Sequence, residues 1–146
     1  MPQESNASSS STLLAAKQTG KFVFANGDVY EGEYTLYQLT GSIERSGVGK
    51  FTSNDGIVYA GKWLNDKMNG KGTFSHPSGM KYEGDFVNGK FDGVGKYVWP
   101  DGSHYEGEFR ESKLEGNGYF RDPTGQLWTG KFSGKYADRL KFKLNM

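Results

Sequence analysis

A short pattern of five residues recurs along this chain: an aromatic residue, any residue, a glycine, any residue and a second aromatic residue. Its leading aromatic and its glycine are Tyr30 and Gly32, Tyr59 and Gly61, Tyr82 and Gly84, Tyr105 and Gly107, and Trp128 and Gly130. The last four copies start 23 residues apart, whereas the first two start 29 apart. A constant period of this size is typical of repeat proteins, in which each copy is one small structural unit.

A second pattern, Gly-x-Gly-x-aromatic, runs in phase with the first and ends at Phe51, Phe74, Tyr97 and Phe120. Its second glycine precedes the next leading aromatic residue by ten positions. A further glycine lies three residues before each leading aromatic, as Gly102 does before Tyr105. Three markers in one phase establish the repeat.

Each repeat is predicted to form a β-hairpin. In both patterns the large residues occupy alternate positions, so those of one strand share a face of the sheet. Between the patterns lie turn sequences such as Pro100-Asp101-Gly102. Proline at the second position and glycine at the fourth favour a type I turn followed by a left-handed glycine. The connections between hairpins, such as 65–69, are polar and short.

Stacked hairpins would give an all-β fold, namely one elongated antiparallel sheet of about five repeats. The leading aromatics would form one row and the aromatics of the second pattern another. Apolar residues make up only 34% of the chain, but aromatics reach 15% and glycines number 22. This composition favours a sheet held by aromatic rows over a globule filled with aliphatic side chains. The glycines are expected where strands bend or where an aromatic ring lies against bare backbone.

The repeats leave three segments to interpret. Residues 1–17 are rich in serine and are predicted to be a disordered tail, although Leu13 to Ala16 could form a short docking helix. The repeat domain spans 18–132, and its six extra residues fall within 35–46. The favoured interpretation of 35–46 is a longer surface loop, and the alternative is a partner-specific contact. Residues 133–146 are expected to cap the last sheet edge, or to dock a partner as a strand.

Composition disfavours several classes of function. The charges nearly balance, 18 Lys and Arg against 17 Asp and Glu, so a nucleic-acid partner is not expected. The chain has no cysteine, no apolar run long enough to span a membrane and no apolar signal-peptide core in its first eleven residues. We therefore expect a soluble protein of the cytoplasm.

Residues with catalytic potential are few. The two histidines, His76 and His104, occupy different positions in their repeats, so a shared metal site is not expected. No nucleophile elbow, P-loop or dinucleotide fingerprint is present. We predict no catalytic residue, no metal and no cofactor, and therefore no enzyme.

Paired carboxylates recur in the first pattern, and they are expected on the face opposite the aromatics. The pairs are Glu31 and Glu33, Glu83 and Asp85, and Glu106 and Glu108. They are interpreted as a solvated acidic stripe that can pair across strands with Lys50 or Lys96.

Taken together, Tyr-Glu-Gly-x-Phe, Gly-x-Gly-x-Phe and Pro-Asp-Gly at this period resemble the MORN repeat (membrane occupation and recognition nexus), over about residues 20–132. The segment 140–146 also resembles the end of a short MORN-motif protein of vertebrate testis. The family resemblance implies an elongated single-sheet scaffold or adaptor of the cytoskeleton, such as a component of the radial spokes of a ciliary or flagellar axoneme. Its alternative implication is a membrane- or phosphoinositide-associated adaptor in trafficking.

A twisted sheet with repeating aromatics offers a surface for a partner protein. The candidate partner-binding residues are Tyr34, Trp63, Phe86, Trp99, Phe109 and Phe132. The alternative is that these side chains only hold the sheet together.

Overall fold

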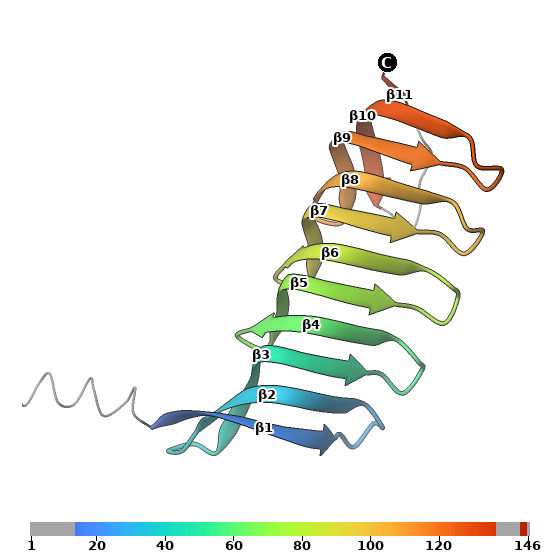
Figure 1. The fold of residues 1–146 in the computed structure, drawn as a ribbon. Helices are drawn as coiled ribbons and strands as arrows, with labels where there is room; N and C mark the ends of the chain where they lie inside the picture. Colours follow the sequence, from blue (N-terminus) through green and yellow to red (C-terminus); the bar gives the residue numbers. More distant parts are fainter. Residues whose placement is uncertain (1–13, 137–143, 146) are drawn as a thin grey trace, which may run out of the picture.

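A computed structural model describes residues 14–136 and 144–145, and the side chains of 14–132. It consists of one antiparallel sheet of eleven strands that lie side by side in chain order (Figure 1). The strands are β1 (Ala15–Val23), β2 (Val29–Tyr37), β3 (Ser42–Thr52), β4 (Val58–Leu64), β5 (Lys67–Ser75), β6 (Lys81–Val87), β7 (Lys90–Val98), β8 (His104–Arg110), β9 (Lys113–Arg121), β10 (Leu127–Tyr136) and β11 (Leu144–Asn145). The predicted fold, an elongated sheet of stacked hairpins, is confirmed.

One set of turns projects from the same side of the stack, on the right in Figure 1. In a representative turn the His76 amide donates to the Met80 carbonyl at 2.9 Å, and the Gly79 amide donates to the His76 carbonyl at 3.0 Å. Gly79 has a φ of +101°, as the predicted left-handed position requires. The turns at 24–28, 53–57, 99–103 and 122–126 have the same two hydrogen bonds. We call these five turns the turn rim.

On the opposite side the β4–β5, β6–β7 and β8–β9 turns have only two residues, whereas the β2–β3 turn has four, 38–41. In Asn65-Asp66 both φ values are positive, 50° and 65°, and Glu111-Ser112 is similar at 49° and 64°. Positive φ at both central residues is the geometry of a type I′ turn, whose twist matches that of the flanking strands. The predicted connection over 65–69 is therefore wrong in length, because β5 already begins at Lys67.

The two predicted aromatic rows form a single row across the sheet. Tyr59 of β4 lies opposite Phe51 of β3 on one side and Phe74 of β5 on the other, and this register repeats along the stack. The row consists of Phe22, Tyr30, Phe51, Tyr59, Phe74, Tyr82, Tyr97, Tyr105, Phe120 and Trp128. We call the face that carries this row the inner face and the opposite one the outer face.

At two residues from the aromatic row in each strand, glycines form a second row. Its members pair directly across the strands: Gly20, Gly32, Gly49, Gly61, Gly72, Gly84, Gly95, Gly107, Gly118 and Gly130. Because glycines have no side chain, the aromatics on one side of the glycine row can approach those on its other side, on the inner face.

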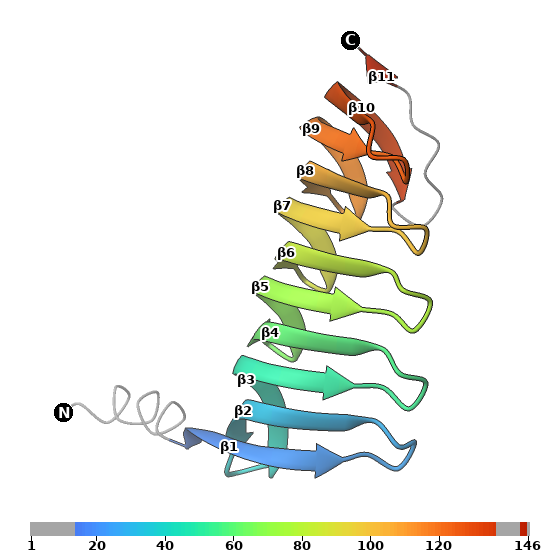
Figure 2. The same cartoon turned by 45° about the vertical axis from the view of Figure 1, so that its right-hand side comes forward.

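The strands bend at the glycine row. In a straight strand the Cα atoms of Tyr82 and Phe86 would lie about 13 Å apart. Their ring centroids are only 5.1 Å apart, and the Tyr82 hydroxyl donates to the Asp85 carbonyl at 2.8 Å. The strand must therefore turn back on itself at Gly84. Figures 1 and 2 show this bend in successive strands.

Close contact between backbones explains why these positions are glycine. A Cβ atom added to Gly84 would lie 2.5 Å from the Gly95 Cα atom and 2.5 Å from the Val94 carbonyl oxygen. A Cβ atom on Gly95 would lie 2.4 Å from the Tyr82 hydroxyl oxygen. The expectation that the glycines mark bends and rings lying on bare backbone is confirmed.

Rings from the first pattern form the core. In three repeats the second aromatic residue packs edge-on between two leading tyrosines: Phe86, for example, lies 5.0 Å from Tyr59 and 5.1 Å from Tyr82, between ring centroids. Trp63 lies in the same way between Tyr30 and Tyr59. Edge-to-face pairs of this kind add about 0.5–1.5 kcal/mol each beyond the area they bury. Because each pair joins neighbouring repeats, the repeats stabilise one another.

Three predicted boundaries need correction. Strand β1 begins at Ala15, so the last three residues assigned to a disordered tail, and half of the suggested docking helix, belong to a strand. Residues 1–13 lie outside the described part of the chain. The insertion at 35–46 is mainly strand rather than surface loop, because it lengthens β2 and β3, which pair up to Tyr37 and Ser42. Hydrogen bonding to β1 as far as Ala15 supports this extension.

The C-terminal boundary is also later than predicted, because β10 continues to Tyr136. The two residues of β11 pair with Lys131 and Phe132 at the edge of β10. The rest of the predicted cap, 137–143 and 146, lies outside the described residues.

Replacing Gly84 by alanine is expected to destabilise the fold by roughly 2–4 kcal/mol, the sum of overpacking and a displaced backbone. The midpoint of urea unfolding, followed by circular dichroism, measures the effect. Gly102→Ala is the matched control, since a Cβ there meets nothing within 4 Å and only its φ of +89° is unfavourable, at about 1 kcal/mol. Equal losses in the two variants would contradict the role given to the glycine row.

Candidate functional site: the inner aromatic face

Aromatic side chains on the inner face fall into two groups by exposure. The leading tyrosines, Tyr30, Tyr59, Tyr82 and Tyr105, are at most 1% exposed. Most aromatics of the second pattern are half-buried, namely Phe51, Phe74 and Phe120. Phe22, in the same row, is also half-buried. The second group therefore supplies the aromatic surface that another molecule can reach.

Four of the six predicted partner-binding residues are part of the core instead. Trp63, Phe86, Phe109 and Phe132 are between 2% and 6% exposed. Each packs against leading tyrosines, which covers its ring. They cannot contact a partner without opening the sheet, so their assignment as a binding surface is wrong.

The other two predicted residues remain half-buried. Tyr34 packs edge-on against Phe22, with ring centroids 4.9 Å apart, and its hydroxyl donates to Gln18. Trp99 lies at the start of a rim turn, 4.7 Å from the ring of Tyr97 and 5.7 Å from that of Phe120. Both therefore border the aromatic surface that another molecule can reach, Tyr34 in the N-terminal half of the stack and Trp99 in the C-terminal half.

A pocket of about 500 Å³ lies at the N-terminal end of the inner face. Aromatic rings from both flanks line it, among them Phe22, Tyr34 and Phe51, together with the rim turn at 24–28. Asp28, Arg45 and Asp66 are its charged lining residues. The pocket continues the aromatic surface of the inner face.

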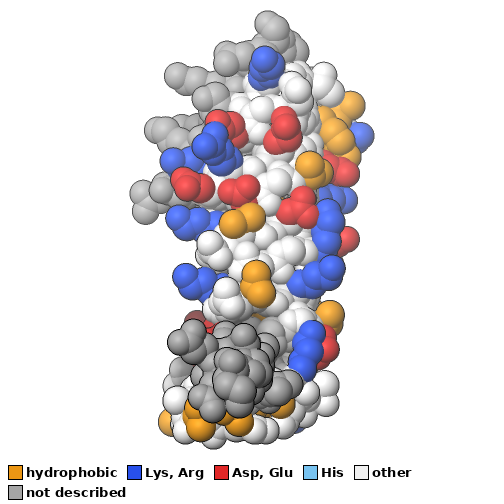
Figure 3. Space-filling view, turned by 90° about the vertical axis from the view of Figure 1, so that its left-hand side faces the viewer, with side chains coloured by type: hydrophobic (Ala, Val, Ile, Leu, Met, Phe, Trp, Pro, Cys, Tyr) orange, Lys and Arg blue, Asp and Glu red, His pale blue; other side chains and the backbone are white. Residues whose placement is uncertain are grey.

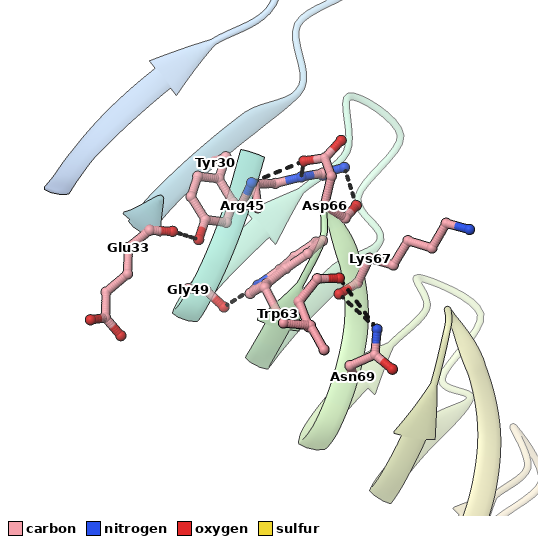
Figure 4. Close-up of polar contacts among 9 residues, drawn as sticks. Tyr30, Glu33, Arg45, Gly49, Trp63, Asp66, Lys67 and Asn69 are labelled. Atoms are coloured by element: carbon pink, nitrogen blue, oxygen red, sulfur yellow. Dashed lines mark hydrogen bonds and ion pairs between the residues drawn. The ribbon is translucent and has the colours of Figure 1, made fainter. Parts of the chain in front are cut away.

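Arg45 occupies a core position in the wall of this pocket (Figure 4). Its place opposite Tyr34 corresponds to that of Met68 opposite Trp63 in the next repeat. The guanidinium carbon lies 4.4 Å from the Trp63 ring centroid, and Nε donates to the Asp66 carboxylate at 2.7 Å. A second guanidinium nitrogen donates to the Asp66 carbonyl at 3.1 Å. The charge is thus held between an indole face and a turn carboxylate.

Asp66 is ionised in this arrangement. Partial burial alone would raise the pKa of its carboxyl, but hydrogen bonds from the Arg45 side chain and amide, and the guanidinium charge, outweigh burial and lower the pKa. The pair therefore contributes no net charge to the pocket, and Asp28 remains as its other charged lining residue.

Arg45 was absent from the residues that the sequence suggested. Aligning the repeats on Gly-x-Gly places Arg45, Met68, Phe91 and Leu114 at one position, two residues before the first glycine. A charged residue among three apolar ones in that column was the signal that could have identified it.

Carboxylates of the outer face have a structural role beyond solvation. The Glu33 carboxylate accepts the Val48 amide at 2.6 Å, and Glu108 accepts the Asn117 amide at 2.6 Å. These amides lie where the strand register shifts, at bulges that leave an N–H without a strand partner. The second carboxylate of each pair thus completes a bulge, which corrects the interpretation as a merely solvated stripe.

The first carboxylates do lie opposite the predicted lysines, since Glu31 pairs in register with Lys50, and Lys96 lies between Glu83 and Glu106. Figure 3 shows lysines, arginines and carboxylates intermingled over the flank of the stack that faces left in Figure 1. Among the described residues of the outer face, the shortest ion pair joins Lys71 Nζ to Asp85 at 2.6 Å.

Comparison with protein-family models assigns the repeats. The MORN repeat model matches residues 19–29, 44–58, 59–81, 82–104 and 105–127, which is more than half of the chain. The chain belongs to the MORN-repeat family. A search of curated proteins finds no match.

Each full-length MORN match begins at a leading aromatic residue and ends just before the next one. One MORN unit such as 59–81 therefore contains β4, the two-residue turn, β5 and a rim turn. The stretch between the first two matches, 30–43, contains the extension of β2 and β3. The lengthened hairpin beside the pocket is thus the part of the sheet that departs from the MORN pattern.

The groups on which chemistry could depend are dispersed over the MORN sheet. His76 Nδ1 lies 2.8 Å from the Ser78 hydroxyl in an exposed turn. His104 lies on the outer face. Its pKa is lowered first by burial and then by the charges of Lys96 and Arg121. Among the described residues, no group of three or more His, Asp or Glu side chains could hold a metal ion. None of the described chain forms an apolar helix of the length that a bilayer requires.

Burial also shifts the leading tyrosines of the MORN repeats. It raises the pKa of Tyr30, Tyr59 and Tyr105 to about 12, and it raises the pKa of Tyr82 further. At Tyr59 this effect exceeds the opposing effect of the hydrogen bond that the hydroxyl donates to the Lys62 carbonyl at 2.6 Å.

Alkali is expected to unfold the sheet through these tyrosines. Their unfolded pKa is about 10, so the stability is complete below that pH and is lost as the pH rises towards the folded pKa. In this interval each tyrosine lowers the free energy of unfolding by about 1.4 kcal/mol per pH unit. Urea titrations across this pH range measure the slope. Tyr59→Phe should give a shallower slope, and an unchanged slope would contradict the assignment.

Removing the Asp66 carboxylate should leave the Arg45 charge unpaired against Trp63. We expect Asp66→Ala to cost about 1–2 kcal/mol, less than for a fully buried pair because Asp66 is half-exposed. Adding Arg45→Met, which installs the residue of the next repeat, should recover most of the loss. A double-mutant cycle in urea measures the coupling. Additive losses would show that the two side chains do not interact.

Proposed function

We propose that this protein is a non-catalytic scaffold that holds other proteins through its inner face. The observation that carries the proposal is the half-buried part of the aromatic row, Phe22, Phe51, Phe74 and Phe120, which runs along the stack with Trp99 of the rim beside it. Within the described part of the chain a single sheet is present, and no second layer lies over this row. Aromatic side chains that stay partly exposed along one face are a feature of interaction sites.

Energetics favour this face as a site of binding. Aromatic side chains dominate the energy of protein interfaces because they bury a large area with few rotatable bonds. Trp99 and Phe120 are already held by neighbouring rings, so little rotamer freedom is lost when a partner covers them. The long repetitive face suits an elongated partner, since equivalent contacts recur with each repeat.

We further propose that the partners belong to the cytoskeleton and that the protein works in the cytoplasm, in an assembly such as the axoneme of a cilium or flagellum. Support for this step comes from the kind of protein in which MORN repeats occur, together with the elongated shape of the sheet. The fold provides a rigid spacer with a continuous binding face, as a structural component needs.

Membrane lipid is the second candidate partner. The outer face carries the described lysines, including Lys50, Lys81 and Lys96, and anionic headgroups attract lysine. Carboxylates alternate with these lysines in the strand register, as in the Glu31–Lys50 pair, and reduce the attraction. Protein binding by the inner face is therefore preferred.

Cross-linking with mass spectrometry in ciliated cells tests the scaffold. The wild-type protein should cross-link to axonemal or cytoskeletal proteins, and Trp99→Gln with Phe120→Gln should abolish these links. Leu64→Gln is the control, because Leu64 is 57% exposed on the outer face and its loss removes apolar area of another surface. Circular dichroism confirms that each variant is folded. Recovery of no cytoskeletal protein would contradict the cellular assignment.

Flotation with liposomes separates the two candidates. We expect the protein not to bind vesicles of neutral lipid. On vesicles with anionic lipid we expect no salt-sensitive binding. Two results together would favour the membrane adaptor. Flotation would be salt-sensitive and abolished by Lys50→Gln with Lys81→Gln, and the protein cross-links would be unchanged in the inner-face variant.

A further inference from the structure

Charge is distributed unevenly between the two faces, although the chain as a whole has a formal net charge of only +1. The turn rim contains four aspartates and no lysine or arginine. These are Asp28, Asp55, Asp101 and Asp122. The rim borders the inner face over its whole length, because its five turns join the strands that carry the aromatic row.

No ion pair of the described residues includes a rim aspartate, although Arg121 donates to the Gly125 carbonyl at 2.7 Å in the turn of Asp122, and Arg45 lines the same pocket as Asp28. The Asp28 carboxylate accepts the Asn54 amide at 2.8 Å, and Asp101 accepts the Ser103 amide at 2.9 Å. Hydrogen bonds from Ser103 lower the pKa of Asp101, and those from Thr124 lower the pKa of Asp122, so both are ionised at neutral pH. The ion pairs of the described residues, Lys17–Glu33, Arg45–Asp66 and Lys71–Asp85, leave all four out.

Cations lie on the other face. A residue next to an inner-face residue in a strand points outward, and by this alternation every described lysine belongs to the outer face. The outward positions include Lys21 beside Phe22, Lys50 beside Phe51, Lys81 beside Tyr82 and Lys96 beside Tyr97. Among the described residues, Arg45 is the cation in an inner-face row, and Asp66 neutralises it. The aromatic surface therefore has an anionic border, in which Arg121 approaches the turn of Asp122 and no lysine or arginine belongs to the turns of Asp55 and Asp101.

We propose that the inner face docks a cationic amphipathic helix of a partner protein, with apolar side chains on the aromatic row and lysines or arginines towards the rim aspartates. This inference rests on the proposed function and specifies the chemistry of the partner. Opposite charges at the border favour encounter and exclude acidic segments, whereas the aromatic row supplies the affinity.

Spacing supports a helix along the stack. Neighbouring hairpins are separated by two strand spacings, about 10 Å. A helix rises 1.5 Å per residue, so seven residues span about the same distance. A partner with basic residues every seventh position, beside a stripe of apolar ones, therefore meets successive rim turns in step. The inner face offers side chains rather than free strand edges, which lie at the two ends of the stack.

Two designed peptides provide the probe. Both form helices with the same leucine stripe, and one carries lysine where the other carries glutamate, at every seventh position beside the stripe. Binding to the full chain is measured by fluorescence anisotropy. We expect the lysine peptide to bind at least about tenfold more tightly, with an affinity that salt reduces. Trp99→Gln with Phe120→Gln should weaken both peptides, which places them on the inner face.

A rim variant isolates the charge. The variant replaces all four rim aspartates by asparagine: Asp28→Asn, Asp55→Asn, Asp101→Asn and Asp122→Asn. Asparagine retains an oxygen for the turn hydrogen bonds but removes the charge. This variant should bind the lysine peptide about tenfold more weakly, as expected for four exposed charge pairs. The control replaces outer-face carboxylates, Glu31→Gln, Glu44→Gln, Glu83→Gln and Glu115→Gln, and should bind as the wild type does.

The outcomes separate this inference from the proposed function. Equal affinity for the two peptides, or no loss in the rim variant, overturns the cationic helix while the inner face stands as a binding surface. No binding of either peptide to the inner face, together with protein links that survive Trp99→Gln and Phe120→Gln, overturns both. Self-association in analytical ultracentrifugation that the rim variant abolishes would show that a second copy occupies the face, and this too overturns the inference.

Discussion

Contact between a tyrosine ring and a glycine of the neighbouring strand is the constraint on which this sheet depends. Tyr82 lies over Gly95, and its hydroxyl reaches the Asp85 carbonyl past the bend at Gly84. The ring fits only because two facing positions lack a Cβ, and the bend then brings Phe86 against Tyr82 and Tyr59. The same contact in successive repeats converts hairpins that would be marginal alone into one cooperative stack.

This bend also decides what the protein can bind. It draws Trp63, Phe86, Phe109 and Phe132 of the first pattern into the core and leaves Phe51, Phe74 and Phe120 of the second pattern half-buried on the inner face. The residues that stabilise the fold and those that a partner can reach are therefore different members of one motif set. The division explains how a sheet with little aliphatic content remains stable while it presents Phe51, Phe74 and Phe120 to solvent.

Regular repetition is interrupted beside the pocket at the N-terminal end of the inner face. The six extra residues lengthen β2 and β3, and Arg45 replaces the apolar residue that other repeats have at its position. The cost of a cation in an aromatic core is offset by the Trp63 face and the Asp66 carboxylate. One end of the repetitive face thereby differs from the rest in length and in charge.

The period of the aromatics and glycines determined the strands, their order and the rim turns, because each follows from side-chain alternation and local backbone preference. Sequence also placed Lys50 opposite Glu31 correctly. Only the tertiary structure decided which rings are buried, since Trp63 and Phe51 both point to the inner face of a strand drawn flat, yet Trp63 is buried and Phe51 is half-buried. The bend at the glycine row makes the difference: it depends on backbones from two strands meeting, and the burial of Trp63 between Tyr30 and Tyr59 depends on neighbouring repeats. Local patterns record alternation along one strand, whereas burial is settled by contacts between strands.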